Sequence, residues 1–237
     1  MPSVAENIAK VRENIAAAAR AAGRDPAEIT LVAATKTQTG DTIRAAVAAG
    51  ITVCGENRVQ ELTAHLAEGA YGGASVHFIG HLQTNKVKYV VGKVDLIHSV
   101  SSEKLLRAID QQAARLGAVQ DILLEINLAG EESKSGFAPE EAPRMAALAA
   151  NMTHVNLRGL MCIPPRAQYL GANLSYFESL HQLAVDIRHE MGDNKTEYGI
   201  LSMGMSDDYP DAVKAGATHI RVGTALFGPR PPLPGTE

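Results

Sequence analysis

Lys36 follows directly on a short apolar stretch and is the residue best placed for chemistry. Residues 30–34 are apolar or β-branched and predict a buried strand, and a polar stretch after them runs to Gly40. Reactive side chains of parallel sheets collect at the carboxyl ends of strands, and Lys36 lies at such an end. An ammonium group beside an apolar strand is partly desolvated, which lowers its pKa and lets the amine attack carbonyls. For an isolated lysine, a side chain that merely extends from the strand end into water is the more usual explanation, so other residues must decide.

Arg221 is the second candidate, because it interrupts an apolar stretch near the end of the chain. Side chains alternate along a strand, so Ile220 and Val222 would face outward while Arg221 points into the sheet's inner side. A buried guanidinium is costly unless its hydrogen bonds are accepted. Either Glu125, a polar residue between apolar neighbours, or a bound ligand would supply the acceptor, and this residue alone leaves both readings open.

Two small-residue loops predict a phosphate site. Glycine lets backbone N–H groups approach an anion, and a helix that begins behind each loop adds its positive end. Asp207 and Asp208 follow the first loop, and we expect them to cap the next helix and point away from the anion. The loop residues are Ser202, Met203, Gly204, Met205 and Ser206 in the first, and Gly223 and Thr224 in the second.

The elements that must position these residues alternate between strand and helix. A first amphipathic helix spans 3–22, with Ser3 and Glu6 as a capping box and Gly23 as its stop. Strands are predicted over 30–34, 51–54, 76–79, 96–100, 121–128, 155–163, 200–203 and 219–222. Helices are predicted over 42–49, 58–66, after 85, over 102–117, from 139, and over 173–191 and 209–215.

Eight strand–helix units at this length predict a (β/α)₈ TIM barrel with an extra N-terminal helix. An open doubly wound sheet competes, but no Gly-x-Gly-x-x-Gly turn follows the first strand. We therefore expect one domain over residues 1–237, with the helix within 1–23 and a proline-rich tail over 229–237. In such a barrel the eighth strand pairs with the first, which brings Arg221 and the two loops beside Lys36.

Composition limits the partners. A net charge of −4 and a pI near 6.1 give no basic surface for nucleic acid. No apolar run is long enough to span a bilayer, and the N-terminus lacks the order of charged and apolar residues that a secretion signal has.

Cys54 and Cys162 are expected to be buried thiols rather than a disulfide, which suits a cytoplasmic protein. His77 and His81 straddle a strand end without a nearby carboxylate, so no metal site is expected. No apolar patch is visible, which favours a monomer.

The amine, the arginine and the phosphate loops lie along one arc of the predicted barrel. That arc fits a flat phosphorylated carbonyl compound, with a Schiff base at Lys36 and a ring nitrogen near Arg221. Pyridoxal 5′-phosphate (PLP) has this layout, and its enzymes use a lysine imine with an Asp or Arg partner for the ring nitrogen.

Several stretches also resemble one known family. They cover the chain in order from the first strand to the last: Ala34 to Thr37, Gly55 to Glu61, His77 to Lys86, Gly159 to Met161, Leu201 to Asp208 and Ile220 to Gly228. On these residues the sequence is similar to the PLP homeostasis proteins, whose fold resembles the N-terminal barrel of alanine racemase.

The resemblance implies a PLP-binding protein with Lys36 as the imine lysine. Phosphate would be held by the two loops, Arg221 would face the ring nitrogen, and Asn57 and Lys134 would lie near the cofactor. Two residues depart from the family pattern: Arg58 replaces a more frequent aromatic residue, and Gln38 replaces a histidine or lysine. Both concern the rim of the site. The cofactor-binding residues implied are Lys36, Asn57, Ser202, Met203, Gly204, Ser206, Arg221, Gly223 and Thr224.

Three functions fit these residues, and the first is favoured over the other two. The first is a carrier that buffers PLP or delivers it to apoenzymes, because racemisation needs a second proton donor. In alanine racemase that donor is a tyrosine on a separate domain, and this chain ends soon after the eighth strand. Arginine also keeps its proton, so the ring is a poorer electron sink. The second is a slow racemase with Tyr198 or Tyr209 as the other base. The third is an aldolase-type barrel acting on a phosphorylated sugar, with Glu125 moving protons.

Overall fold

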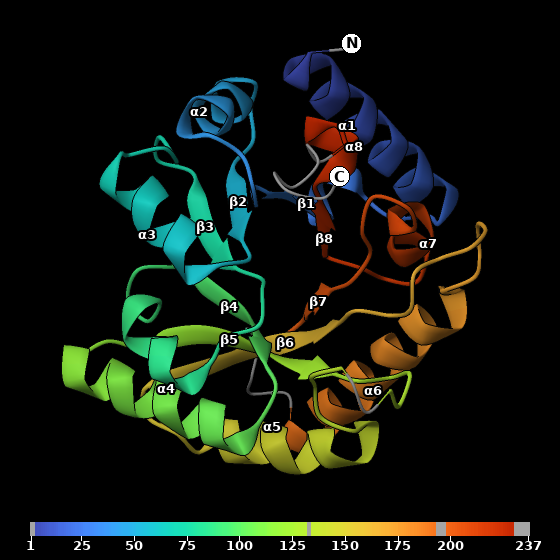
Figure 1. The fold of residues 1–237 in the computed structure, drawn as a ribbon. Coiled ribbons are helices and arrows are strands. Elements are labelled where there is room, and N and C mark those ends of the chain that lie inside the picture. The colour runs from blue at the N-terminus through green and yellow to red at the C-terminus, as the bar shows by residue number, and fades with distance from the viewer. Residues whose placement is uncertain (1–2, 132–133, 193–197, 230–237) are drawn as a thin grey trace, which may run out of the picture.

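The computed structural model describes residues 3–131, 134–192 and 198–229. Its strands pair in parallel and in chain order, and β8 returns to β1, so the sheet closes into a barrel (Figure 1). The predicted (β/α)₈ barrel is thus confirmed. The strands are β1 (Thr30–Ala34), β2 (Val53–Glu56), β3 (Ser75–Phe78), β4 (Leu96–Val100), β5 (Gln120–Ile126), β6 (Val155–Cys162), β7 (Ile200–Ser202) and β8 (His219–Val222).

Helices cover the outside of the barrel (Figure 1). The stretch after Asn85, predicted as an α-helix, is the short 3₁₀ segment η2. The helices are α1 (Val4–Ala21), α2 (Gly40–Ala48), α3 (Val59–Ala67), α4 (Glu103–Leu116), α5 (Ala142–Ala150), α6 (Leu174–Met191), α7 (Tyr209–Lys214) and α8 (Thr224–Phe227), and the 3₁₀ segments are η1 (Pro26–Glu28), η2 (Thr84–Tyr89) and η3 (Pro139–Glu141).

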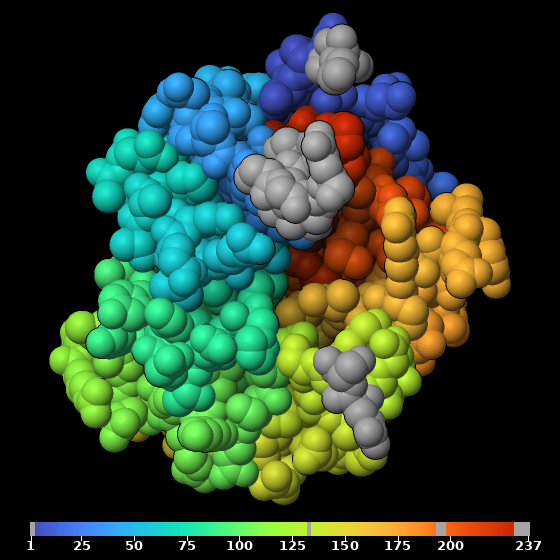
Figure 2. All heavy atoms as spheres, in the orientation of Figure 1, coloured from blue at the N-terminus to red at the C-terminus, as the bar shows by residue number. Residues whose placement is uncertain are grey.

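Helix α1 lies outside the eight strand–helix units, as predicted. The Ser3–Glu6 capping box is present, with the Glu6 amide donating to Ser3 Oγ over 3.2 Å. Asn7 Nδ2 donates to the Leu226 carbonyl, and Asn14 Nδ2 to the Tyr209 hydroxyl, so α1 is tied to α8 and α7. Figure 2 shows the result: the blue N-terminal helix meets the red end of the chain.

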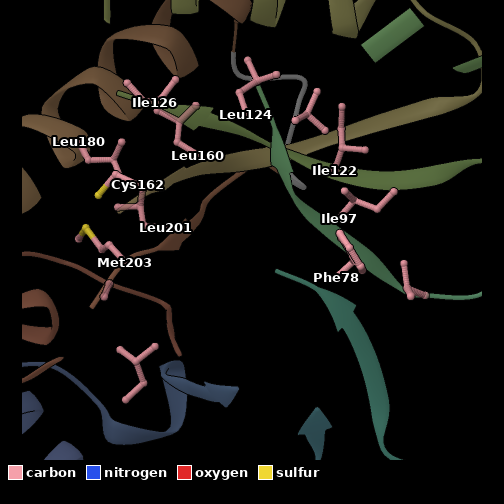
Figure 3. Packing of buried hydrophobic residues seen from close by; sticks show 14 of the residues in the cluster. Phe78, Ile97, Ile122, Leu124, Ile126, Leu160, Cys162, Leu180, Leu201 and Met203 are labelled. Carbon is pink, nitrogen blue, oxygen red and sulfur yellow. The ribbon is translucent and has the colours of Figure 1, made fainter. Parts of the chain in front are cut away.

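Strand side chains alternate between the barrel interior and the helices. Figure 3 shows the outward set, which packs in the large apolar cluster with Leu180 of α6. Two small apolar clusters fill parts of the interior, one of Val32, Ala34, Val53 and Ile79 and the other of Leu96, Leu123 and Met161. The labelled outward residues are Phe78, Ile97, Ile122, Leu124, Ile126, Leu160, Cys162, Leu201 and Met203.

Strand β2 runs further than predicted. Gly55 and Glu56, expected in a turn, are the last residues of the strand, because Gly55 pairs with Ala34 on one side and Glu56 with Phe78 on the other. No described helix has the length and apolar character needed to cross a membrane.

Candidate functional site

A cavity of about 650 Å³ opens at the carboxyl ends of the strands. It contains side chains from opposite ends of the sequence because β1 and β8 are paired, with Val32 opposite Arg221. This volume is in the range of small-molecule sites. Among the predicted site residues, those lining this cavity are Lys36, Asn57, Ser206, Arg221, Gly223 and Thr224.

Lys36 is half-buried and begins the turn after β1. The next residue, Thr37, has a φ of 64°, the only positive φ at a described non-glycine residue. For a β-branched residue such a conformation costs on the order of 1–3 kcal/mol and persists only where the surroundings impose it. The turn that presents Lys36 is therefore held in a strained shape by its neighbours.

Asn57 contributes an acceptor that the described protein does not use. Its Oδ1 is buried and has no hydrogen-bond partner among the described residues, while the side chain lines the cavity. Gly80 fixes its backbone, since a Cβ at Gly80 would lie 2.0 Å from the Asn57 carbonyl oxygen. An orphaned polar atom in a cavity fits a bound polar ligand.

The loops after β7 and β8 meet at the same cavity. Ser206 Oγ accepts a hydrogen bond of 3.3 Å from the Ala225 amide at the start of α8, which leaves its hydroxyl hydrogen for a ligand. The Asp208 carboxylate accepts hydrogen bonds from the Met205 backbone amide and from the Asn173 side-chain amide. Asp207 forms an ion pair with Arg166. Asp208 occupies the N-cap position of α7 but makes no side-chain capping bond, so the capping predicted for it is not found.

Three predicted residues do not line this cavity. The Ser202 hydroxyl is fully buried and bonds to Arg221 and His98 instead, and Met203 packs outward in the apolar core. Gly204 has a φ of 87°, and a Cβ there would lie 2.5 Å from the Ala212 methyl, so this glycine serves close packing on α7. Their contact with phosphate stays a prediction.

Arg221 is held by neutral acceptors rather than by the carboxylate considered from the sequence. Its Nη1 donates to Ser202 Oγ over 2.5 Å and its Nη2 to the Cys162 carbonyl over 2.9 Å, and no ion pair with Glu125 is present in the described parts. The guanidinium also lines the cavity. Burial lowers its pKa. Two neutral acceptors, the Ser202 hydroxyl and the Cys162 carbonyl, thus hold the guanidinium in place at the cavity.

A layer of histidines lies under Arg221, and sequence reasoning missed it. His77 Nδ1 is 2.9 Å from His98 Nε2, and His98 Nδ1 is 2.8 Å from Ser202 Oγ; the His77 and His219 rings stack. Side chains alternate along a strand, so the rule that places Arg221 of β8 inside the barrel also places His219 of β8 inside. Applied to β3, the same rule places His77 inside. Burial lowers the pKa of His77 to about 4 and that of His219 to about 3. Burial also lowers the pKa of His98 well below its usual value, and the neighbouring histidines and Arg221 lower it further.

These pKa shifts predict acid sensitivity. The unfolded chain takes up protons at these histidines near pH 6.5, whereas the folded barrel resists until about pH 4 at His77. The free energy of unfolding should therefore fall as pH drops below about 6.5, by on the order of 3 kcal/mol for His77 alone. Urea unfolding across this range measures it. A His77→Gln variant should show a shallower decline, and an equal slope in the variant would contradict the assignment.

The other candidates lie around or away from the cavity. Glu125 lines a neighbouring cavity; Ser135 donates to its Oε1, and burial raises its pKa. Lys134 lines both cavities and pairs with Glu131, and Arg58 is exposed beside Glu61. Tyr198 and Tyr209 are buried elsewhere, the latter against Asn14. Cys54 and Cys162 are free buried thiols, as predicted.

Comparison with known proteins decides the family. A family model described as the N-terminal domain of alanine racemase matches residues 7–231. The PLP homeostasis protein of Pseudomonas aeruginosa is 40% identical over 230 residues, which cover 97% of each chain. That of Escherichia coli is 40% identical over 238 residues, covering 97% of this chain and 98% of the relative. The chain belongs to the PLP homeostasis protein family.

A solved structure of this family agrees. PipY of Synechococcus elongatus, solved with PLP bound, is 33% identical, has a TM-score of 0.82, and is matched over 95% of this chain and 100% of its own. The resemblance inferred from the sequence motifs is thereby confirmed, and PLP is the ligand seen in a relative. In this member of the family, the cavity at Lys36 is lined by the donors Ser206, Thr224 and Arg221 and by the acceptor oxygen of Asn57, which is unpaired among the described residues. A ligand such as PLP needs groups of both kinds.

Proposed function

We propose that this chain binds PLP at the barrel mouth as an imine on Lys36 and serves PLP homeostasis, with little or no catalytic turnover. One observation carries the proposal: a single cavity joins an amine, an arginine, an unused amide oxygen and two small-residue loops. These groups match the aldehyde, the ring nitrogen and the phosphate of PLP in kind. The names of the relatives and the PLP-bound PipY structure support the same ligand.

Each residue has a distinct task in this proposal. PLP supplies an aldehyde carbon, which forms a C=N bond with Lys36 Nζ while its oxygen leaves as water with the two amine hydrogens. Ser206, Thr224 and the backbone at Gly223 bind the phosphate, and Asn57 accepts a hydrogen bond at the cavity wall. Ser202 acts through Arg221, whose guanidinium it holds.

The carrier reading rests on Arg221 and on the tyrosines. A guanidinium keeps its proton, so the ring nitrogen beside it stays unprotonated and withdraws electrons weakly. A racemase needs a second proton donor, and neither Tyr198 nor Tyr209 lines the cavity. Buffering PLP and delivering it to PLP-dependent apoenzymes fits this arrangement.

We place the protein in the cytoplasm as a monomer whose single PLP-binding domain spans 1–237. The tail beyond Pro229 lies outside the described residues.

Removing one phosphate donor should weaken binding selectively. A Ser206→Ala variant should lose affinity for PLP by roughly 10- to 150-fold, because a hydrogen bond to a charged group contributes roughly 1.5–3 kcal/mol. Its affinity for pyridoxal, which lacks phosphate, should not change. The control variant Ser179→Ala, on the surface of α6, should keep its affinity for both PLP and pyridoxal. Titration calorimetry measures both ligands. An equal loss for pyridoxal would remove Ser206 from the phosphate site.

The visible absorbance spectrum of the purified protein, before and after borohydride, tests the whole proposal. A yellow protein whose band collapses on reduction, with the pyridoxyl adduct mapped to Lys36 by peptide mass, supports it. Amino acids added to the loaded protein then separate a carrier from a racemase. A colourless protein that takes up no added PLP would refute the proposal and favour the aldolase-type barrel.

A further inference from the structure

The turn that carries Lys36 is tied down on both sides to one buried carboxyl group. Glu56, at the end of β2, is fully buried. Thr35, just before Lys36, donates its hydroxyl hydrogen to Glu56 Oε1 over 2.7 Å. The same oxygen is 2.8 Å from His65 Nδ1, and the other ring nitrogen of His65 is 3.2 Å from the Gln38 carbonyl. Thr35 and Gln38 flank Lys36 and Thr37, so both ends of the turn connect to Glu56.

We propose that Glu56 and His65 act as positioning residues that hold the Lys36 turn in its strained shape and so align the amine for imine formation. We call Thr35, Glu56, His65 and the Gln38 carbonyl the turn clamp. It deepens the function proposed above and rests on it. The clamp explains two features that the cofactor site leaves unexplained: a glutamate buried at a strand end, and the φ of 64° at Thr37.

The hydrogen bonds of Glu56 are not explained by a purely structural role in the apolar core. A buried carboxyl group is costly, and a hydrophobic side chain of similar volume is often at least as stabilising. Glu56 Oε1 instead has three hydrogen-bond partners, Thr35, His65 and Tyr71, the last of which donates over 3.0 Å. Burial and Glu56 raise the pKa of Tyr71, so its hydroxyl keeps the hydrogen it donates. Thr35 and His65 connect this oxygen to the Lys36 turn, and Tyr71 does not.

The third partner supplies a matched control. Tyr71 contacts the same oxygen as Thr35 and His65, and this hydrogen bond does not involve the turn. A Tyr71→Phe variant therefore removes one hydrogen bond from the buried carboxyl group and leaves both links of the clamp intact. Glu56→Gln weakens the centre of the clamp, and His65→Phe cuts the link to Gln38 while keeping a ring of similar shape.

The experiment separates alignment of Lys36 from ligand binding in the cavity at Lys36. Stopped-flow absorbance measures the rate of imine formation with PLP, and calorimetry measures the affinity for pyridoxine 5′-phosphate, an alcohol that forms no imine. Glu56→Gln and His65→Phe should slow imine formation by at least about tenfold, because misplacing a reacting group by about 1 Å costs on the order of 100-fold. Their affinity for pyridoxine 5′-phosphate should equal that of the wild type, and Tyr71→Phe should react at the wild-type rate.

A second readout needs no cofactor. The Gln38 amide donates to the Thr35 carbonyl across the turn. In the protein without PLP, hydrogen exchange in the peptide that contains Gln38 should be faster in Glu56→Gln and His65→Phe, with strand β5 unchanged as an internal reference.

Three results would overturn the clamp: wild-type imine rates in both variants, equal slowing in Tyr71→Phe, or an equal loss of affinity for pyridoxine 5′-phosphate. If the wild-type protein itself forms no imine, the proposed function fails instead. Hydrogen exchange then still decides whether Glu56 and His65 hold the turn.

Discussion

A Lys36→Ala variant should lose the reducible PLP adduct completely. Lys36 is the lysine at the end of β1, beside Arg221 and the loops at the mouth, and alanine offers no amine for a C=N bond. Reduction with borohydride in the presence of added PLP, followed by mass measurement of the intact protein, should show one pyridoxyl group on the wild type and none on the variant. The affinity for pyridoxine 5′-phosphate should persist, because the phosphate loops are untouched.

Lys134 provides the control for this experiment. It lines the same cavity, so it is the other lysine that PLP would meet there. A Lys134→Ala variant should keep a full adduct on Lys36. A stoichiometric adduct on the Lys36→Ala variant would show that Lys36 is not the imine lysine. An adduct lost only in Lys134→Ala would assign the imine to Lys134 instead.

A Gly159→Ala variant should be severely destabilised. Gly159 lies inside β6 with a φ of 149°, and a Cβ there would lie 1.9 Å from the Ile200 carbonyl oxygen of β7. It follows a register shift, in which Ile122 and Leu123 of β5 pair with Leu157 and Gly159 and skip one residue, as in a β-bulge. We expect a loss of about 3–5 kcal/mol from backbone strain and the clash, a large share of a typical total of roughly 5–15 kcal/mol.

The same substitution should also disturb the site, because the carbonyl of Cys162 further along β6 accepts the hydrogen bond of Arg221. Urea unfolding measures the stability, and PLP affinity of the remaining folded protein measures the second effect. Gly199→Ala is the control: its Cβ would meet nothing within 4 Å, and its φ is not positive. If both variants unfolded at the same urea concentration, the close approach of β6 and β7 at Gly159 would not matter.

Much of the fold could be read from local patterns. Eight apolar stretches, each followed by a helical or turn-rich segment, predicted the barrel, and β1, β4 and β8 begin and end at the predicted residues. Lys36 and Arg221 were found because both interrupt or follow a strand, and strand periodicity alone assigns their direction. Ser206, Gly223 and Thr224 followed from the residue types that phosphate loops use.

The features that local patterns did not supply depend on contacts between distant segments. Ser202 was assigned to the phosphate loop because it is next to it in sequence, yet it is the last residue of β7 and its hydroxyl faces His98, 104 residues earlier. Glu56 was placed in a turn because glycine and asparagine flank it, whereas pairing of β2 with both neighbouring strands extends the strand through it. Propensity was overridden by the sheet in this case.

The sequence by itself determined the barrel, the family, the lysine that follows the first strand and the inward arginine, because each depends on the order and periodicity of residues along the chain. Only the tertiary structure decided what lies around them: the histidine layer under Arg221, the unused oxygen of Asn57, and the clamp that joins Thr35 and Gln38 through Glu56 and His65. The physical reason is closure of the barrel. Polar side chains that point inward from different strands must find partners across it, and no local pattern states which partner each one finds.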